Sequence, residues 1–157
     1  MGNPVSTETI RDFIAASVAC LDDDRLEDWV GFFAEQATYR IVSRENHVRG
    51  LPLSLLLCEG LDMIRDRVTS LRNANIYNIH WDCHILGRSL IERLSDSEYR
   101  AVTPYCVYQT SQEGVSFLFS VGHYHDRLSI QGQQPALLER LVVSDTGAIK
   151  SNLSTPI

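Results

Sequence analysis

Several kinds of catalytic and binding motif are missing from this sequence. It contains no Gly-rich phosphate loop, no GxSxG nucleophile elbow and no HExxH zinc motif. Its 4 cysteines lie far apart and form no CxxC pair, which argues against a zinc ribbon or a thioredoxin-type centre. We therefore expect the cysteines to be buried free thiols in a reducing compartment.

Positive charge is also scarce, with 14 Lys and Arg against 20 Asp and Glu and a net charge of -6. Nucleic-acid binding depends largely on cationic neutralisation of the phosphates, so it is not expected as a main function. No apolar run reaches the ~20 residues that span a bilayer. No signal peptide is recognisable at the start of the sequence. The sequence thus predicts a cytoplasmic protein with neither a nucleic-acid nor a membrane partner.

The composition is that of an ordinary globular domain. Hydrophobic residues make up 44% of the chain and charged residues 22%, so disorder is not expected. A chain of 157 residues is long enough to bury one sizeable core. No repeat or linker divides it, and we predict a single domain over residues 1–157.

The first part of the chain has the periodicity of helices. Ser6 or Thr7 can cap a first helix, in which apolar residues recur at three- and four-residue steps as far as Leu21. A third helix is predicted over residues 61–72. The second helix, between these two, is predicted to bury Leu26, Trp29, Val30 and Phe33.

The remaining segments are predicted mainly as strands and loops. Pro104 is expected at a sheet edge or a bulge, because proline cannot donate to a strand ladder. Residues 45–52 are predicted as a loop from their Asn, Gly and Pro. The predicted strands cover residues 37–43, 53–60, 83–94, 98–110, 115–130 and 136–145.

This order of elements indicates an α+β domain, with N-terminal helices packed on one face of a strongly curved, mostly antiparallel sheet. It is typical of the NTF2-like (cystatin-like) cone, in which the sheet wraps around helices and leaves a pocket at its open end. The same scaffold serves isomerases, dehydratases and structural subunits, so the fold does not decide the function.

Residues 76–87, "IYNIHWDCHILG", form the densest group of ligand-type side chains in the chain. In an extended strand, residues two apart share a face, so His80, Asp82 and His84 would lie together. Two histidines and a carboxylate are the ligand set of many non-haem iron enzymes. Along a strand, however, the outer two of these residues are ~13 Å apart. We therefore expect no metal site here unless the strand bends sharply.

The other candidate metal ligands are His123 and His125, which form an HxH pair on one face of a later strand. One ion could reach both, but nothing nearby supplies a third ligand, and the alternation of this segment is that of a half-exposed strand. A Rieske cluster needs two separated Cys-His pairs, whereas Cys83-His84 is a single pair. We expect no metal and no cofactor to be bound by this chain.

A pocket enzyme would need a general base with a tuned pKa inside the cone. The candidates are Asp24 and Asp28 on the second helix, together with Tyr39 and His84. No spacing among them singles out a proton-transfer pair, and buried Tyr and His are commonly hydrogen-bonded core residues. A free-standing dehydratase or isomerase, or a small-molecule-binding protein without chemistry, stays as the alternative interpretation.

Three segments resemble the small (β) subunit of Rieske-type aromatic-ring-hydroxylating dioxygenases. The segment "LDDDRLEDWVGFFAEQATYRI" is similar to the helix-helix-strand opening of that family, and "MIRDRVTSLR" to its "L.DRV..LR" helix. The third segment, "IYNIHWDCHILG", stands where the family usually has a strand of the type "R.RH.V.N". Within the family, the sequence looks most like the small subunits of terephthalate dioxygenase and salicylate 5-hydroxylase.

The resemblance implies a structural, assembly subunit that is not itself catalytic. In the family, the large (α) subunit carries the Rieske [2Fe-2S] cluster and the mononuclear iron, and three α and three β chains form the complex. Contacts between β chains are implied as well, with a homotrimer of the small chain alone left open, and a reductase would act indirectly. The whole enzyme would hydroxylate a benzoate-like aromatic acid.

The basic "R.RH" pattern of the family is reduced here to His84, so contacts made by the arginines of that pattern do not carry over to this chain. The predicted third helix carries a mixed-charge face that is either solvated or a contact surface for another chain. On the second interpretation, we predict Arg65, Arg67, Arg72 and His84 at a subunit interface.

Overall fold

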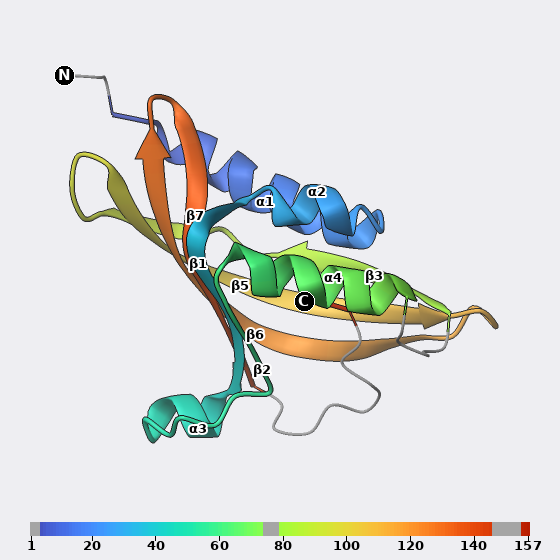
Figure 1. The fold of residues 1–157 in the computed structure, drawn as a ribbon. Helices are drawn as coiled ribbons and strands as arrows, with labels where there is room; N and C mark the ends of the chain where they lie inside the picture. The colour runs from blue at the N-terminus through green and yellow to red at the C-terminus, as the bar shows by residue number, and fades with distance from the viewer. Residues whose placement is uncertain (1–3, 74–78, 146–154) are drawn as a thin grey trace.

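The structure is a computed structural model, and it describes residues 4–73, 79–145 and 155–157. Within these residues, no helix is long and apolar enough to span a membrane. Figure 1 shows α1, α2 and α4 lying over one side of a curved sheet, while α3 lies apart from them near the ends of β1 and β2. The elements are α1 (Thr7–Asp22), α2 (Leu26–Val30), β1 (Phe33–Ser43), α3 (Arg44–Val48), β2 (Leu56–Glu59), α4 (Leu61–Asn73), β3 (His80–Leu86), β4 (Leu90–Arg93), β5 (Glu98–Ser111), β6 (Ser116–Gln131) and β7 (Gln134–Ser144).

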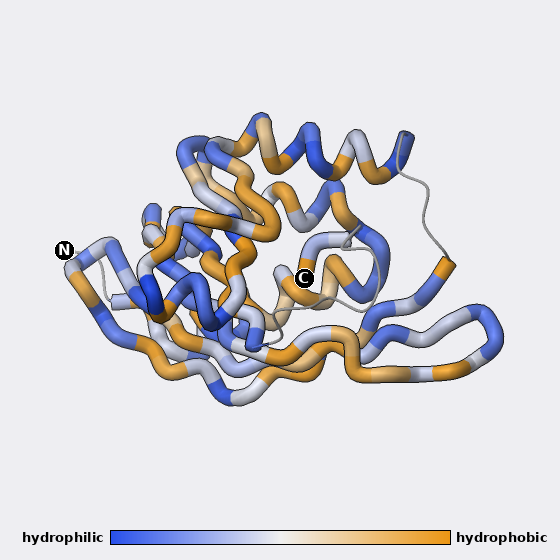
Figure 2. The backbone as a smooth tube through the Cα atoms, turned by 90° about the horizontal axis from the view of Figure 1, so that it is seen from below, coloured by the Kyte–Doolittle hydropathy of each residue, from blue (hydrophilic) through white to orange (hydrophobic). Residues whose placement is uncertain are grey.

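Helices α1 and α4 lie where the apolar periodicity predicted them. The side chain of Ser6 caps α1 by accepting a hydrogen bond from the backbone N–H of Thr9 at 3.1 Å. The predicted stripes of both helices face the core, and their polar residues face outward (Figure 2, where orange and blue alternate along the chain). Their fully or nearly buried residues include Ile10, Ile14, Val18, Leu21, Ile64, Val68 and Leu71.

Two local predictions for residues 26–52 were wrong. Helix α2 ends at Val30, and Phe33 is the first residue of β1 rather than the last buried residue of a helix. Phe33 is nevertheless buried, with its ring 4.9 Å from that of Trp29, because the turn through Gly31 brings the strand back under the helix. Residues 44–48 form the short helix α3 inside the predicted loop, capped by the side chain of Ser43.

The sheet has the order β2-β1-β7-β6-β5-β3, with β4 also paired to β5. All these pairs are antiparallel except β1 with β7, which is parallel. The helices cover the concave face, so the domain is the predicted α+β cone with a mostly antiparallel sheet. At Gly122, β6 approaches β7 so closely that a Cβ would lie 1.9 Å from the carbonyl oxygen of Val143.

The strand predicted over residues 83–94 is divided into β3 and β4, which pair with successive parts of β5. Pro104 lies opposite the break between them, and its carbonyl accepts a hydrogen bond from Gly87 at 2.8 Å. The register shift between β5 and β6 lies at Val107 and Tyr108 instead. Pro104 is therefore not at the register shift; it pairs with His123 of β6 on one side and lies at the gap between β3 and β4 on the other, where no described strand residue is paired with it.

Candidate functional site: a filled cone and an open sheet face

The concave side of the sheet, where an NTF2-like enzyme would hold its substrate, is filled by large side chains. Trp29 of α2 packs edge-on against Tyr39 of β1, with ring centroids 5.1 Å apart. Tyr105 of β5 and Tyr124 of β6 stack at 4.5 Å with nearly parallel rings. Burial raises the pKa of the Tyr105 hydroxyl to about 12 and that of Tyr124 well above its ordinary value. Both hydroxyls therefore stay protonated at neutral pH and are weaker acids than an ordinary tyrosine.

A buried ion pair lies in the same interior. Both guanidinium nitrogens of Arg140 that face Asp126 donate to its carboxylate, at 2.9 and 2.8 Å, and a third donates to Ser17 at 3.0 Å. Arg140 also lies over the ring of Tyr124, 4.7 Å from its centroid. Burial opposes the charge on Arg140, but the attraction of Asp126 outweighs it and raises the pKa of the guanidinium. All three guanidinium nitrogens of Arg140 thus donate hydrogen bonds within the chain, and the carboxylate of Asp126 is bound to two of them.

The open end of the cone is closed by residues 155–157. Ile157 is almost fully buried, and the hydroxyl of Tyr39 both donates to its carbonyl at 2.8 Å and accepts from its N–H at 3.0 Å. Figure 1 places this end of the chain between α4 and the strands. The side chain of Ile157 thus occupies interior space, and its backbone uses both hydrogen-bonding capacities of Tyr39.

The segment first considered as a metal site is the edge strand β3. As predicted, His80, Asp82 and His84 share its inner face, and the intervening side chains point outward. They do not converge, because His84 Nδ1 contacts Asp22 of α1 at 2.5 Å whereas His80 Nε2 lies 3.6 Å from Asp82. Asp22 also accepts the backbone N–H of His84 at 2.9 Å, so this carboxylate fixes α1 to β3. In the described part of the chain, no three His, Cys, Asp or Glu side chains could hold a metal ion together.

The HxH pair occupies the outer face of β6. The ring of His125 lies 5.6 Å from that of His47 on α3. Burial and the neighbouring His47 lower the pKa of His125, so this imidazole is neutral at physiological pH. His123 and His125 are consequently packed or surface side chains of the strand.

The structure does not bring the four candidate acid–base groups together. Asp24 and Asp28 are on the outside of the domain, where they pair with Arg72 and Arg25 respectively. Tyr39 is bound to residue 157, and the imidazole of His84 is buried against Asp22. Each of the four candidates thus has a different partner, and the geometry gives a pocket enzyme no support.

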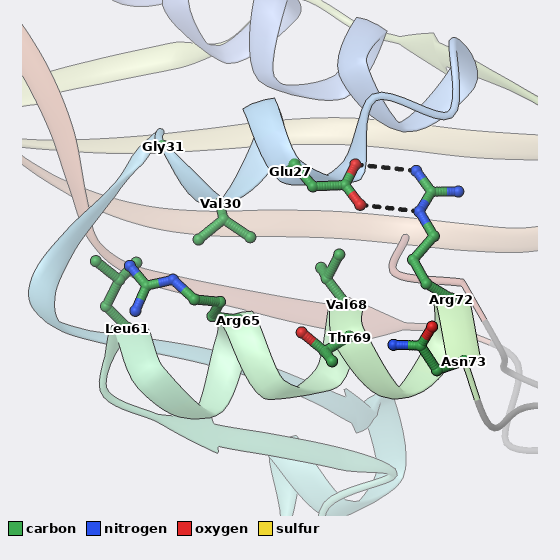
Figure 3. A pocket seen from close by; sticks show the side chains of 9 residues that line it. All are labelled: Glu27, Val30, Gly31, Leu61, Arg65, Val68, Thr69, Arg72 and Asn73. Atoms are coloured by element: carbon green, nitrogen blue, oxygen red, sulfur yellow. Dashed lines mark hydrogen bonds and ion pairs between the residues drawn. The ribbon is translucent and has the colours of Figure 1, made fainter.

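A groove of about 470 Å³ lies between α2 and α4 and contains two of the predicted interface arginines. Figure 3 shows Arg72 reaching across the groove to Glu27, with Arg65 farther along α4. Arg72 also pairs with Asp24 at 2.8 Å, and these carboxylates raise its pKa. Arg65 pairs with Asp62 of its own helix, and Arg67 lies near Cys58. An interface role for these residues stays a prediction.

His84, the fourth predicted interface residue, has a fully buried side chain. It could therefore affect a partner only by holding β3 against α1, not by direct contact through its imidazole. That role also stays a prediction.

Among the described residues, no segment covers the convex face of the sheet where β3, β5 and β6 run together. Trp81, Ile85, Tyr108 and Leu118 are exposed there by 58%, 54%, 40% and 44%. The strand register places Cys83 opposite Tyr108, and Tyr108 opposite Leu118, so these side chains form one continuous apolar surface. We call Trp81, Cys83, Ile85, Tyr108 and Leu118 the β3 face.

Sequence reasoning missed the importance of two features. The strand alternation that turns Trp81 and Ile85 outward was read correctly, but an exposed apolar surface was not inferred from it. The Asp126–Arg140 pair was also missed, although both charges fall at inward positions of alternating strands, next to Tyr124 and Val142. A charged residue in an apolar inward register is the signal that could have found this pair.

The chain is similar to known proteins along most of its length. Residues 6–134 match the model of the SnoaL-like domain family. The anthranilate 1,2-dioxygenase small subunit of Burkholderia cepacia is 38% identical over 137 residues, which cover 87% of this chain and 85% of that protein. Subunit beta 1 of the terminal oxygenase component of terephthalate 1,2-dioxygenase from a Comamonas species is 32% identical over 148 residues, covering 94% and 96%.

A solved structure agrees with these relatives. It comes from Novosphingobium aromaticivorans DSM 12444, and it is assigned as the beta subunit of an aromatic-ring-hydroxylating dioxygenase. The two structures superpose with a TM-score of 0.87 at 37% sequence identity, over 96% of this chain and 95% of the other. The similarity therefore includes the sequence as well as the fold.

Proposed function

We propose that this chain, which belongs to the SnoaL-like domain family and to the family of small subunits of aromatic-ring-hydroxylating dioxygenases, is the structural, non-catalytic subunit of such an enzyme. A large subunit would carry the Rieske cluster and the mononuclear iron. The complex would contain three copies of each chain, work in the cytoplasm and receive electrons from a reductase. Its substrate would be a benzoate-like aromatic acid.

The observation that carries this proposal is the filled cone. In a pocket enzyme of this fold, the concave side of the sheet must admit a substrate and offer it a proton-transfer group. Here Trp29 and Ile157 occupy that space, Tyr39 is bound to Ile157, and Asp126 is bound to Arg140. This arrangement supports a role of the interior groups in folding, with the chemistry on another chain.

The described residues also do not fit either iron centre. His84 is held by Asp22, and His80 lies beside Asp82 on the same strand rather than facing a second ligand-bearing element. All four cysteines are free thiols; Cys20 and Cys58 are buried as predicted, whereas Cys106 is partly buried and Cys83 is exposed on the outer face of β3. We therefore assign no step of the reaction to a metal held by this chain.

The substrate class rests on the relatives alone. Anthranilate and terephthalate, named for two of them, are both benzene carboxylates. We extend that class to the complex formed by this chain, without assigning the choice among such acids to any of its residues.

The proposal is tested by purifying this chain, its large subunit and their co-expressed complex, and by assaying each with a reductase, O2 and benzoate, anthranilate or terephthalate. We expect co-purification and turnover that requires the large subunit. Turnover by the small chain alone, or failure of the two chains to co-purify, would contradict it.

A variant of the complex separates a structural from a catalytic role for the interior. Tyr39→Phe removes the interior hydroxyl that a cone enzyme would use as an acid. We expect kcat of the assembled complex to change by less than about twofold, whereas loss of a general acid typically costs about 10²–10⁴-fold. A loss of that size in a normally assembled complex would show that Tyr39 takes part in the chemistry.

A further inference from the structure

The β3 face is an apolar surface at an unpaired sheet edge. Within the described sheet, β3 is the terminal strand and pairs only with β5. Trp81 and Ile85 are both more than half exposed on it, and the outer face of β3 bears no charged side chain between residues 79 and 86. Soluble proteins usually protect such edges with charges or a covering segment. An uncovered apolar edge of this kind indicates a contact surface for another chain.

The convex side of the same sheet is covered by a loop at β1 and β7, unlike the β3 face. On the convex side of β1 and β7, the loop after α3 lies over Val42 and Leu141, and Arg40 binds Ser54 and Pro52 of that loop. Val42 is consequently buried although it points away from the cone. No described segment does the same for Trp81 and Ile85.

An acidic pocket adjoins the β3 face. Its volume is about 230 Å³, and it lies where the end of α1 meets the start of β3. No arginine or lysine is among its lining residues, which are Leu21, Asp22, Asp24, Ile79, His80, Trp81, Asp82 and Thr155. Asp24 already pairs with Arg72 at 2.8 Å, but the three carboxylates outnumber that one guanidinium. Beside an exposed indole they suit a further cationic side chain, which the carboxylates would attract and the indole face would stack against.

The arginines of a second copy of this chain do not supply such a cation readily, and its single lysine, Lys150, lies outside the described residues. Every arginine of the chain lies within the described residues, and each already contacts an acceptor or another partner in its own chain. Two copies would also bring together the same three carboxylates on chains that each carry a net charge of -6. The charge distribution thus favours a chain other than a second copy as the partner that binds the β3 face and the acidic pocket.

We propose that the large subunit docks on the β3 face and inserts an arginine or lysine side chain into the adjoining acidic pocket. This inference rests on the proposed function, which supplies the partner. Trp81 would be the central contact, because aromatic side chains that lose their exposure on binding dominate interface energetics. The carboxylates would fix the register of the partner by charge.

The apolar part is tested with Trp81→Ser and, as matched control, Val48→Ser, which removes an even more exposed apolar side chain from α3 on another part of the surface. The Kd of each purified chain for the purified large subunit is measured by biolayer interferometry. We expect Trp81→Ser to raise the Kd about 30-fold, the loss typical of a hot-spot residue, and Val48→Ser to change it less than about twofold. Circular dichroism melting of the free chains checks that both variants are folded.

The charged part is tested with Asp24→Asn against Asp28→Asn. The two aspartates are similarly exposed, at 67% and 65%, but only Asp24 lines the pocket. Asn also tolerates the positive φ of 56° at position 24. We expect Asp24→Asn to raise the Kd about three- to tenfold at about 50 mM salt, and the difference to shrink at about 500 mM salt as screening increases. Asp28→Asn should behave like the parent chain at both salt concentrations.

The outcomes separate the inference from the proposed function. If the parent chain does not bind the large subunit, the proposed function fails. If the parent binds and folded Trp81→Ser binds equally well, the docking surface is wrong while the function stands. If the parent chain alone forms an oligomer in light scattering that Trp81→Ser dissociates, the occupant is a second copy and the proposal of the large subunit is overturned.

Discussion

The two faces of the curved sheet differ in how their side chains are satisfied. On the concave face, the charged side chains Asp126 and Arg140 form an ion pair with each other, and the hydroxyl of Tyr39 is hydrogen-bonded to residue 157. On the convex face, Trp81 and Ile85 are large apolar side chains that nothing in the described chain covers. The same sheet therefore has a concave face that is packed within the chain and a convex face that leaves large apolar side chains exposed.

The difference between the two faces indicates which part of this scaffold carries the functional site. In an NTF2-like cone, the expected place is the interior, but here large side chains occupy the interior and its Asp126–Arg140 ion pair is closed within the chain, although the hydroxyl of Tyr124 has no hydrogen-bond partner among the described residues. The exposed apolar surface is outside, which agrees with a chain that acts through assembly.

The interior should be most sensitive at the buried ion pair. Arg140→Met leaves the carboxylate of Asp126 buried without its partner, and we expect a loss of about 3–5 kcal/mol in the free energy of unfolding. Urea unfolding followed by circular dichroism measures it. The double variant Asp126→Leu with Arg140→Met should recover much of the loss, because no unpaired charge remains. A loss below about 1 kcal/mol for the single variant would contradict the pairing described above.

Ile157 should be the next most sensitive position. Ile157→Ala removes buried methyl groups from the closed end of the cone and should cost about 2–4 kcal/mol in urea unfolding. The matched control is Ile85→Ala on the β3 face, where more than half of the side chain is already exposed. We expect the control to cost clearly less. Equal losses at both positions would mean that Ile157 is not part of the packed interior.

The interior tyrosines should make the fold sensitive to high pH. Burial raises the pKa of Tyr105 from 10 to about 12, and it also raises the pKa values of Tyr39 and Tyr124. Above pH 10 the unfolded chain therefore binds fewer protons than the folded chain, and stability falls as the pH rises. The stabilisation is complete below pH 10 and is lost as the pH approaches 12.

The measurement is the urea midpoint between pH 9 and about 11.5, a window that spans the ordinary tyrosine pKa. Tyr105→Phe should flatten the decline, whereas Tyr108→Phe, on the exposed β3 face, should leave its slope as in the parent chain. An identical decline in all three proteins would show that Tyr105 does not contribute.

The smallest effect is expected at the surface of α4. Arg65→Ala removes an exposed pair with Asp62 on the same helix, and pairs of this kind contribute less than about 0.5 kcal/mol. Urea unfolding should therefore barely change. The same variant tests whether Arg65 is an interface residue, because a Kd for the large subunit that rises tenfold or more would place it in the contact. A loss of stability above about 1 kcal/mol would show that the pair is not merely a surface pair.

Much of the fold could be predicted from the sequence because its elements are strongly periodic. The stripe of α1, the stripe of α4 and the alternation in β5 to β7 each fixed a face, and the family resemblance agreed with their order. The end of α2 and the existence of α3 could not be predicted in the same way. Both depend on local capping and turns, at Gly31 and Ser43, which the apolar pattern does not record.

The site was harder to predict, because the candidate residues were chosen by type and not by environment. The sequence showed that His80, Asp82 and His84 share a face, but it could not show that Asp22 would reach His84 from another element. It also could not show that Ile157 would return to Tyr39, across a separation of 118 residues. Contacts between distant segments depend on the curvature of the sheet, which no local pattern specifies.

The contrast between the two faces can be tested most directly by hydrogen–deuterium exchange of this chain, alone and in complex with the large subunit. The account predicts new protection in β3 and in the β5 and β6 segments around Tyr108 and Leu118, with no change around Tyr39 and Arg140, which are already protected in the free chain. Unchanged exchange in β3, with new protection confined to other surfaces or to the interior, would contradict it.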